Sequence, residues 1–147
     1  MAHVTFVEQM AAAADYFAIF AIARSDGSVQ ATLVKAGVLE DPDNGSPSVG
    51  VVVGGDARKL VLLRQSGRAT VVFARDGQWV AVEGRARLEG PDDPLPPNAD
   101  RSLSALLRTV FLAAGGTHDD WDEFDRVMAR ERRTVVFVRA DRISTNS

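Results

Sequence analysis

The chain has 147 residues, of which 46% are hydrophobic, and a formal net charge of -3. It contains no cysteine and only two histidines, His3 and His118, which excludes a disulfide framework, a thiolate nucleophile and a Cys/His zinc site. A weakly acidic chain without a long basic block also lacks the electrostatic footprint of a nucleic-acid-binding protein. We therefore expect a single domain over residues 1–147, with a sizeable core and with neither a metal site nor a nucleic-acid partner.

The N-terminal segment is apolar but lacks the features of a membrane anchor. Residues 11–23 are interrupted by Asp15, and they have neither the length of a membrane span nor the basic flank of a signal segment. Thr5 and Glu8 have the spacing of a capping box and predict a short first helix that begins there. We expect a cytoplasmic protein without a membrane partner.

Two segments with residue types typical of β-strands follow this helix. Residues 16–24 and 29–39 are rich in aromatic and β-branched side chains and flank Asp26-Gly27, which predicts a β-hairpin. Residues 40–47 consist of turn formers, and a third strand ends at Val53.

A basic pair follows the third strand. Gly54 and Gly55 can adopt positive φ at a sharp turn, and Asp56 is a good helix N-cap. Four consecutive apolar residues within 57–65 fit either a helix or a strand, and we predict a helix from the cap and from the Ser66-Gly67 stop. Arg58 and Lys59 would then offer positive charge in the first helical turn, where an anion such as phosphate is favoured. The alternative is a solvated basic pair on an ordinary turn.

A second hairpin is predicted from residues 68–75 and 78–88, which flank Asp76-Gly77. The alternation of the second strand places Val80 and Val82 on one face and Trp79 on the other. Trp79 is thus expected to point away from the core, toward a partner subunit or a bound ring system, or to be a partly covered surface side chain.

The remaining chain predicts a loop, two helices and a last strand. Residues 90–100 contain four prolines and read as a surface loop. Apolar side chains at helical spacing within 103–114 and 121–128 indicate two helices that pack on the core, and 134–139 is the last strand before a loose tail at 144–147. The acidic residues at 119–125 fit a solvated helix N-terminus better than a metal site.

The predicted fold class is α+β: a six-stranded, mostly antiparallel split β-barrel with peripheral helices. A barrel this small has little room inside for a large ligand. We therefore expect binding on its outer wall or between two subunits.

Three short motifs resemble the pyridoxamine 5'-phosphate oxidase-like, flavin-binding split-barrel superfamily. Ala57-Arg58-Lys59 is similar to its Ser-Arg-Lys phosphate motif, Val82-Glu83-Gly84 to its Val-Glu-Gly strand, and Thr32-Leu33-Val34-Lys35 to its Val-Leu-Leu-Lys strand. Residues 119–128 and 132–136 resemble the actinobacterial branch of that superfamily, whose members use the deazaflavin coenzyme F420.

This resemblance implies a homodimer of split barrels that holds its cofactor, coenzyme F420 or alternatively FMN, in a groove at the subunit interface. Arg58 and Lys59 would bind the cofactor phosphate, and the strand from Gln30 to Val34 would run beside the ring. The residues expected to contact the cofactor are Gln30, Ala31, Thr32, Leu33, Lys35, Val53, Arg58, Lys59 and Trp79.

The implied activity is an F420-dependent reductase that transfers a hydride to an unsaturated small molecule, with no catalytic side chain. Two departures from the pattern are visible: Val61 and Leu62 replace a polar Arg-Asn pair of the deazaflavin-using relatives, and residues 134–147 lack the Trp- and Arg-containing motif of true pyridoxamine phosphate oxidases. Vitamin B6 oxidation is therefore not expected. The alternatives are an FMN-binding protein, a non-catalytic module that binds a flavin-like ligand, and an interaction dimer that has lost its cofactor.

Overall fold

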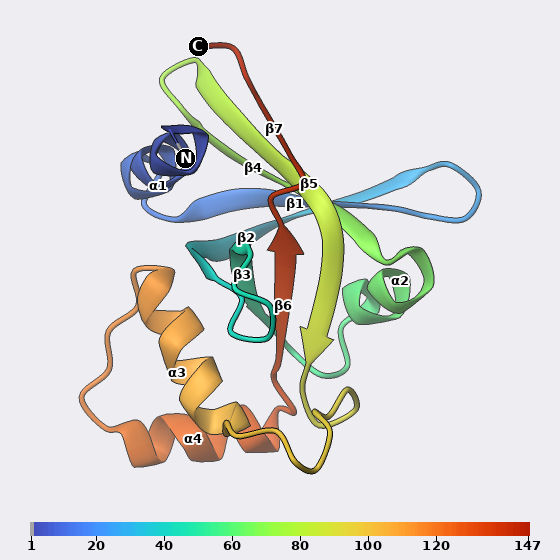
Figure 1. Ribbon diagram of the computed structural model, residues 1–147, viewed down its shortest axis with the longest axis vertical. Helices are drawn as coiled ribbons and strands as arrows, with labels where there is room; N and C mark the ends of the chain where they lie inside the picture. The colour runs from blue at the N-terminus through green and yellow to red at the C-terminus, as the bar shows by residue number, and fades with distance from the viewer. Residues whose placement is uncertain (1) are drawn as a thin grey trace.

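The structure, a computed structural model, describes residues 2–147 as one barrel with helices around it (Figure 1). The helices are α1 (Ala2–Ala13), α2 (Arg58–Ser66), α3 (Leu103–Ala113) and α4 (Trp121–Arg130). The strands are β1 (Phe17–Ala23), β2 (Val29–Glu40), β3 (Pro47–Val53), β4 (Arg68–Arg75), β5 (Gln78–Glu89), β6 (Thr134–Arg139) and β7 (Arg142–Thr145).

The sheet closes on itself. Its strand order is β4-β1-β2-β3-β6-β5-β7, and β4 also pairs with β5, so that β1 to β6 form a closed barrel with β7 added beside β5. Every pairing is antiparallel. The predicted six-stranded antiparallel barrel with peripheral helices is confirmed.

Both predicted hairpins are present, and local turn chemistry accounts for them. In the β1–β2 turn Gly27 has φ of 87°, and the backbone N–H of Ser28 donates to Asp26 Oδ1 at 2.9 Å. In the β4–β5 turn both Asp76 and Gly77 have positive φ, at 52° and 81°. Such paired left-handed residues match the twist of the flanking strands, which is why Asp-Gly is favoured there.

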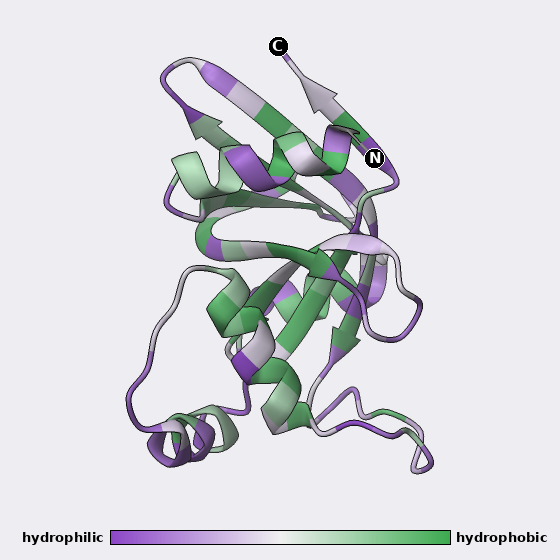
Figure 2. Cartoon of the chain, turned by 60° about the vertical axis from the view of Figure 1, so that its left-hand side comes forward, coloured by the Kyte–Doolittle hydropathy of each residue, from purple (hydrophilic) through white to green (hydrophobic). Residues whose placement is uncertain are grey.

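Two hydrophobic clusters make the core. The larger one fills the barrel and includes the fully buried Phe20 and Phe73. The smaller one packs α3 and α4 against β3 and β6, through Leu106, Leu107, Val110, Phe124, Val135 and Phe137. Figure 2 shows α3 mainly in the colour of hydrophobic residues, whereas α4 carries many hydrophilic residues. The expected packing of both helices on the core is confirmed.

Hydrogen bonds of side chains fix the start of each of these two helices. Ser102 accepts from the N–H of Ala105, and Asp120 accepts from the N–H of Glu123 at 3.1 Å. Arg108 on α3 and Asp125 on α4 then form an ion pair between the helices. No helix within residues 2–147 is long and apolar enough to cross a membrane.

Two sequence predictions about the chain ends are wrong. The first helix begins before Thr5, which therefore lies inside α1 rather than at its start. The tail predicted to be loose at 144–147 is tied to the β4–β5 hairpin: Ser144 and Thr145 belong to β7, and Asn146 Nδ2 donates to the carbonyl of Gly77 at 2.9 Å. The tail is ordered because β7 pairs with β5 and Asn146 bonds to the β4–β5 turn. No local sequence pattern predicts that β5 has an edge free for this pairing.

Candidate functional site

The hinge between β3 and α2 is built differently from its sequence prediction. The N-cap of α2 is Ala57, without a capping hydrogen bond from a side chain, so Asp56 lies one residue too early to cap the helix. Gly55 does not have positive φ; instead a Cβ there would lie 2.5 Å from the carbonyl oxygen of Arg132. The N–H of Gly55 also donates to the carbonyl of Glu131 at 3.1 Å. Gly55 is thus required for close approach of two backbones.

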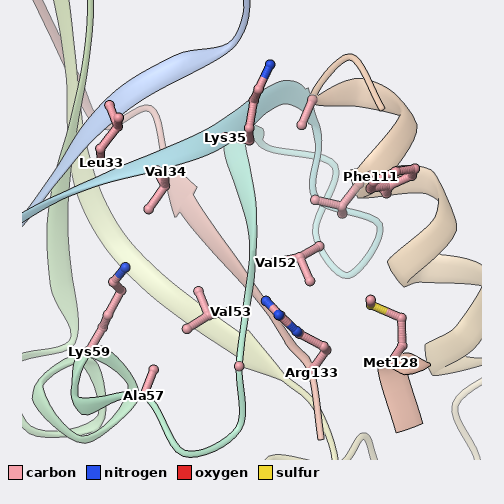
Figure 3. A pocket seen from close by; sticks show the side chains of 13 residues that line it. Leu33, Val34, Lys35, Val52, Val53, Ala57, Lys59, Phe111, Met128 and Arg133 are labelled. Atoms are coloured by element: carbon pink, nitrogen blue, oxygen red, sulfur yellow. The ribbon is translucent and has the colours of Figure 1, made fainter. Parts of the chain in front are cut away.

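A cavity of about 460 Å³ opens beside this hinge, between α2 and the α3–α4 pair. Figure 3 shows Lys59 on one side and Arg133 and Met128 on the other, with Val53 between them and Val34 pointing in from β2. Its lining consists of Leu33, Val34, Lys35, Val52, Val53, Gly54, Ala57, Lys59, Val110, Phe111, Ala114, Met128 and Arg133. The walls are therefore mainly apolar, with a few cationic groups. This combination suits a ligand with an apolar body and an anionic group.

Lys59 is the cation of this cavity without an ionic partner. No carboxylate of residues 2–147 forms an ion pair with its ammonium group. Burial lowers the pKa of Lys59, because desolvation disfavours the charged form. An anion placed beside Lys59 would offset that cost. The first N–H groups of α2, which lack acceptors within the helix, lie at the same end of α2 as this lysine.

The other two cations of the lining already have partners. Lys35 Nζ donates to the carbonyl oxygen of Asp15 at 2.7 Å and lies 4.2 Å from the centre of the Phe17 ring. Arg133 pairs with Glu131 at 2.8 Å. Lys59 is therefore the lining cation with most to gain from a bound anion.

Four of the predicted cofactor residues line this cavity, namely Leu33, Lys35, Val53 and Lys59. Arg58 is exposed at the start of α2 and is outside the lining, as are Gln30, Ala31, Thr32 and Trp79. Trp79 is 37% exposed and points away from the core as predicted, but it is at the start of β5, close to the β4–β5 turn.

Two polar atoms on β2 have no hydrogen-bond partner among residues 2–147. They are Gln30 Oε1 and Thr32 Oγ1, and both are inaccessible to solvent. Residues 30, 32 and 34 share one face of the strand, and Val34 of that face lines the cavity. Buried polar groups without partners are rare in folded proteins, and these two lie on the strand predicted to run beside a bound ring.

Sequence reasoning missed the half of the cavity that comes from the C-terminal part of the chain. Phe111 and Met128 were predicted as core residues from their helical spacing, and both do pack on the second cluster while also facing the cavity. Arg133 lies in the 132–136 segment that resembles the F420-using branch, but no cofactor contact was predicted for it. These residues face the cavity because α3 and α4 pack beside β3, a tertiary arrangement that no local sequence pattern indicates.

No protein-family model matches the sequence. Among solved structures, the chain is similar to a conserved hypothetical protein from Mycobacterium tuberculosis, with 20% identity over 92% of this chain and 82% of that one and a TM-score of 0.62. It is similar to a pyridoxamine 5'-phosphate oxidase-related, FMN-binding protein from Nostoc punctiforme, with 11% identity over 96% and 81% and a TM-score of 0.63.

A third similar structure is a putative pyridoxamine 5'-phosphate oxidase from Listeria innocua, with 14% identity over 95% of this chain and 98% of that one and a TM-score of 0.57. Identities this low show the fold alone. The chain has the fold of the pyridoxamine 5'-phosphate oxidase-like, FMN-binding split barrels.

Proposed function

We propose that this protein binds a phosphate-bearing flavin-type cofactor, coenzyme F420 or alternatively FMN, and acts as an oxidoreductase. The observation that carries the proposal is Lys59, a partly buried cation that has no ion pair within residues 2–147 and lies in a largely apolar cavity at the start of α2. The hinge residues Ala57-Arg58-Lys59 are similar to the phosphate motif named above, and the fold is one on which an FMN-binding protein is known.

The residues present fit such a cofactor. Lys59 and the free N–H groups of the first turn of α2 would hold the phosphate, since both favour negative charge. Val34, on the same face of β2 as Gln30 and Thr32, would lie against the apolar part of the ring. Val34, Val53 and the side chains of α3 would exclude water.

The bound cofactor would supply hydride transfer to an unsaturated small molecule, and the protein would orient the two reactants. A reductase of this kind needs no acid or base from the protein. The cavity accordingly requires only cations for the phosphate and apolar walls for the ring.

A homodimer belongs to this proposal. The outer face of the β1–β2 hairpin leaves large apolar side chains in solvent, with Phe17 44%, Ile19 43%, Val29 58% and Leu33 63% exposed. The register places Ile19 directly opposite Leu33, and Leu33 also lines the cavity. A second copy that covers this face would therefore close the cavity as well.

A non-catalytic module that binds the same ligand is the second candidate. It is favoured by Val61 and Leu62 on α2, where the deazaflavin-using relatives carry polar residues. Binding without turnover across quinones, enones and tetrapyrroles would select this candidate. An interaction protein that had lost its cofactor would be expected to pair Arg58 and Lys59 with its own carboxylates, and within residues 2–147 neither has such a pair.

The experiment is a comparison of cofactor affinity between two charge-removing variants of α2. Lys59→Ala should weaken F420 or FMN binding by roughly 1.5 to 3 kcal/mol, because it removes a charged contact to phosphate. Arg64→Ala is the matched control, since Arg64 lies on the same helix, outside the cavity, in a 2.6 Å ion pair with Asp93. Fluorescence titration measures both. Equal effects of the two substitutions would count against the proposed site.

A further inference from the structure

A second cavity, of about 400 Å³, adjoins the Lys59 cavity. The two share Gly54 and Arg133 in their linings. The second is lined by Gly54, Asp56, Arg130, Glu131, Arg132 and Arg133, so three guanidinium groups and two carboxylates surround it. We call it the arginine cavity.

The arginine cavity is held in a fixed relation to the hinge. Arg132 adopts a left-handed backbone with φ of 51°, which turns the chain between α4 and β6. The carbonyl of Arg132 lies against Gly55, and that of Glu131 accepts from the N–H of Gly55. The hinge before α2 and the arginine-bearing turn are thus attached to each other through backbone contacts at Gly55.

The ionic partners of these arginines are exchangeable. Arg132 pairs with Asp92 of the proline-rich loop, and the two side chains are 54% and 52% exposed. Arg133 pairs with Glu131, also at the surface. Arg130 has no ion pair within residues 2–147, which leaves one guanidinium available. Exposed ion pairs contribute little to stability, so an incoming anion can replace Asp92 at small cost.

We propose that the arginine cavity is a second anion subsite, which takes an acidic group that the ligand of the Lys59 cavity carries beyond its first phosphate, in exchange for Asp92. This inference rests on the proposed function, since it extends the same ligand past Gly54. FMN has no acidic group beyond its phosphate, so Arg132 would stay paired with Asp92 when FMN is bound. The acidic tail of coenzyme F420 continues past the phosphate and supplies the carboxylates that guanidinium groups bind well. The subsite therefore discriminates between the two cofactors.

The test compares both cofactors on a double variant, Arg130→Ala with Arg132→Ala. We expect F420 affinity to fall at least about tenfold and FMN affinity to change less than about twofold, because only F420 reaches the subsite. Arg126→Ala is the control: Arg126 is exposed on the same helix and lies outside both cavities. Equal losses for both cofactors, or an unchanged F420 affinity, would overturn the proposal.

A second arm separates the subsite from the proposed function. If wild-type protein binds neither cofactor, the proposed function fails, and the subsite is tested with γ-linked triglutamate alone. Arginine side-chain N–H signals are followed by NMR up to about 10 mM peptide, the range of weak binding. Shifts at Arg130 and Arg132 but not at Arg126 would support the subsite, and unshifted signals at Arg130 and Arg132 would refute it.

Discussion

Lys59 is the residue on which the proposed site depends, because it combines partial burial with the absence of an ion pair in the described chain. A lysine in this position is costly without a ligand, since its charge is desolvated and unpaired. A bound phosphate would supply the missing partner and raise the pKa of Lys59 again. Binding and protonation are therefore linked at this residue.

The pH dependence of cofactor affinity follows from that linkage. The pKa of Lys59 is lowered in the free protein and raised in the complex, so affinity is fully present below the lower pKa and falls as pH rises through it. The decline should start at lower pH than for an ordinary lysine. Dissociation constants measured upward from about pH 7, where a phosphate monoester is ionised, would show it. Lys59→Gln should flatten the profile; a Gln variant with the same decline would rule out Lys59 as the titrating group.

Gly55 was singled out in the sequence for the backbone freedom of glycine, but the structure needs it for another property. The sequence interpretation rested on the ability of glycine to adopt positive φ at a sharp turn, whereas in the structure the missing Cβ of Gly55 allows close contact with Arg132. The residue is special in both accounts. Only the tertiary contact shows which property of glycine is needed.

At the scale of elements, a buried ionic network joins the β2–β3 turn to β5 and the proline-rich loop. Arg87 binds Asp41 through two hydrogen bonds of 2.8 and 2.7 Å and Glu89 through one of 2.8 Å. Asp41 and Glu89 are each 2% exposed, and Arg101 adds a 3.0 Å contact to Glu89. The network holds the end of β5 from which residues 90–100 depart.

Removing the central cation should destabilise the fold. Arg87→Met removes both arginine hydrogen bonds of the buried Asp41 and leaves Glu89 with Arg101 alone, and we expect a loss of about 3 to 5 kcal/mol in the free energy of unfolding, measured with urea. Arg142→Met is the control, because Arg142 is 75% exposed in its pair with Glu83, and a change of at most about 1 kcal/mol is expected. Similar losses in the two variants would show that the Arg87 network stabilises the fold no more than an exposed ion pair does.

What the sequence could predict depends on the range of the interactions. Both hairpins were predicted correctly, because the Asp-Gly turns and the alternating strands are local patterns. The burial of Asp41 was not predicted, since its partner Arg87 is 46 positions away. The same holds for the site: Lys59 was found from a short motif, whereas Phe111 and Met128 face the cavity only because α3 and α4 dock beside β3. Local patterns thus predicted the barrel and one wall of the cavity.

At the scale of the whole molecule, the proposed homodimer rests on the apolar side chains that the β1–β2 face exposes. Ile19→Asp should convert a dimer to a monomer in sedimentation equilibrium, because it would place a charge in a desolvated interface. It should also weaken cofactor binding, since Leu33 opposite it lines the cavity. Leu112→Asp is the control, because Leu112 is 51% exposed on α3, outside the β1–β2 hairpin. A dimer that survives Ile19→Asp would place the interface elsewhere.

The measurement that tests the central claim most directly is a titration of the wild-type protein with coenzyme F420, with FMN as comparison, followed by ligand fluorescence. The proposed site predicts saturable binding of one cofactor molecule per chain, with tighter binding of F420 because the arginine cavity takes its acidic tail. Absence of binding of either cofactor at tens of micromolar would contradict the claim that Lys59 and its cavity form a cofactor site.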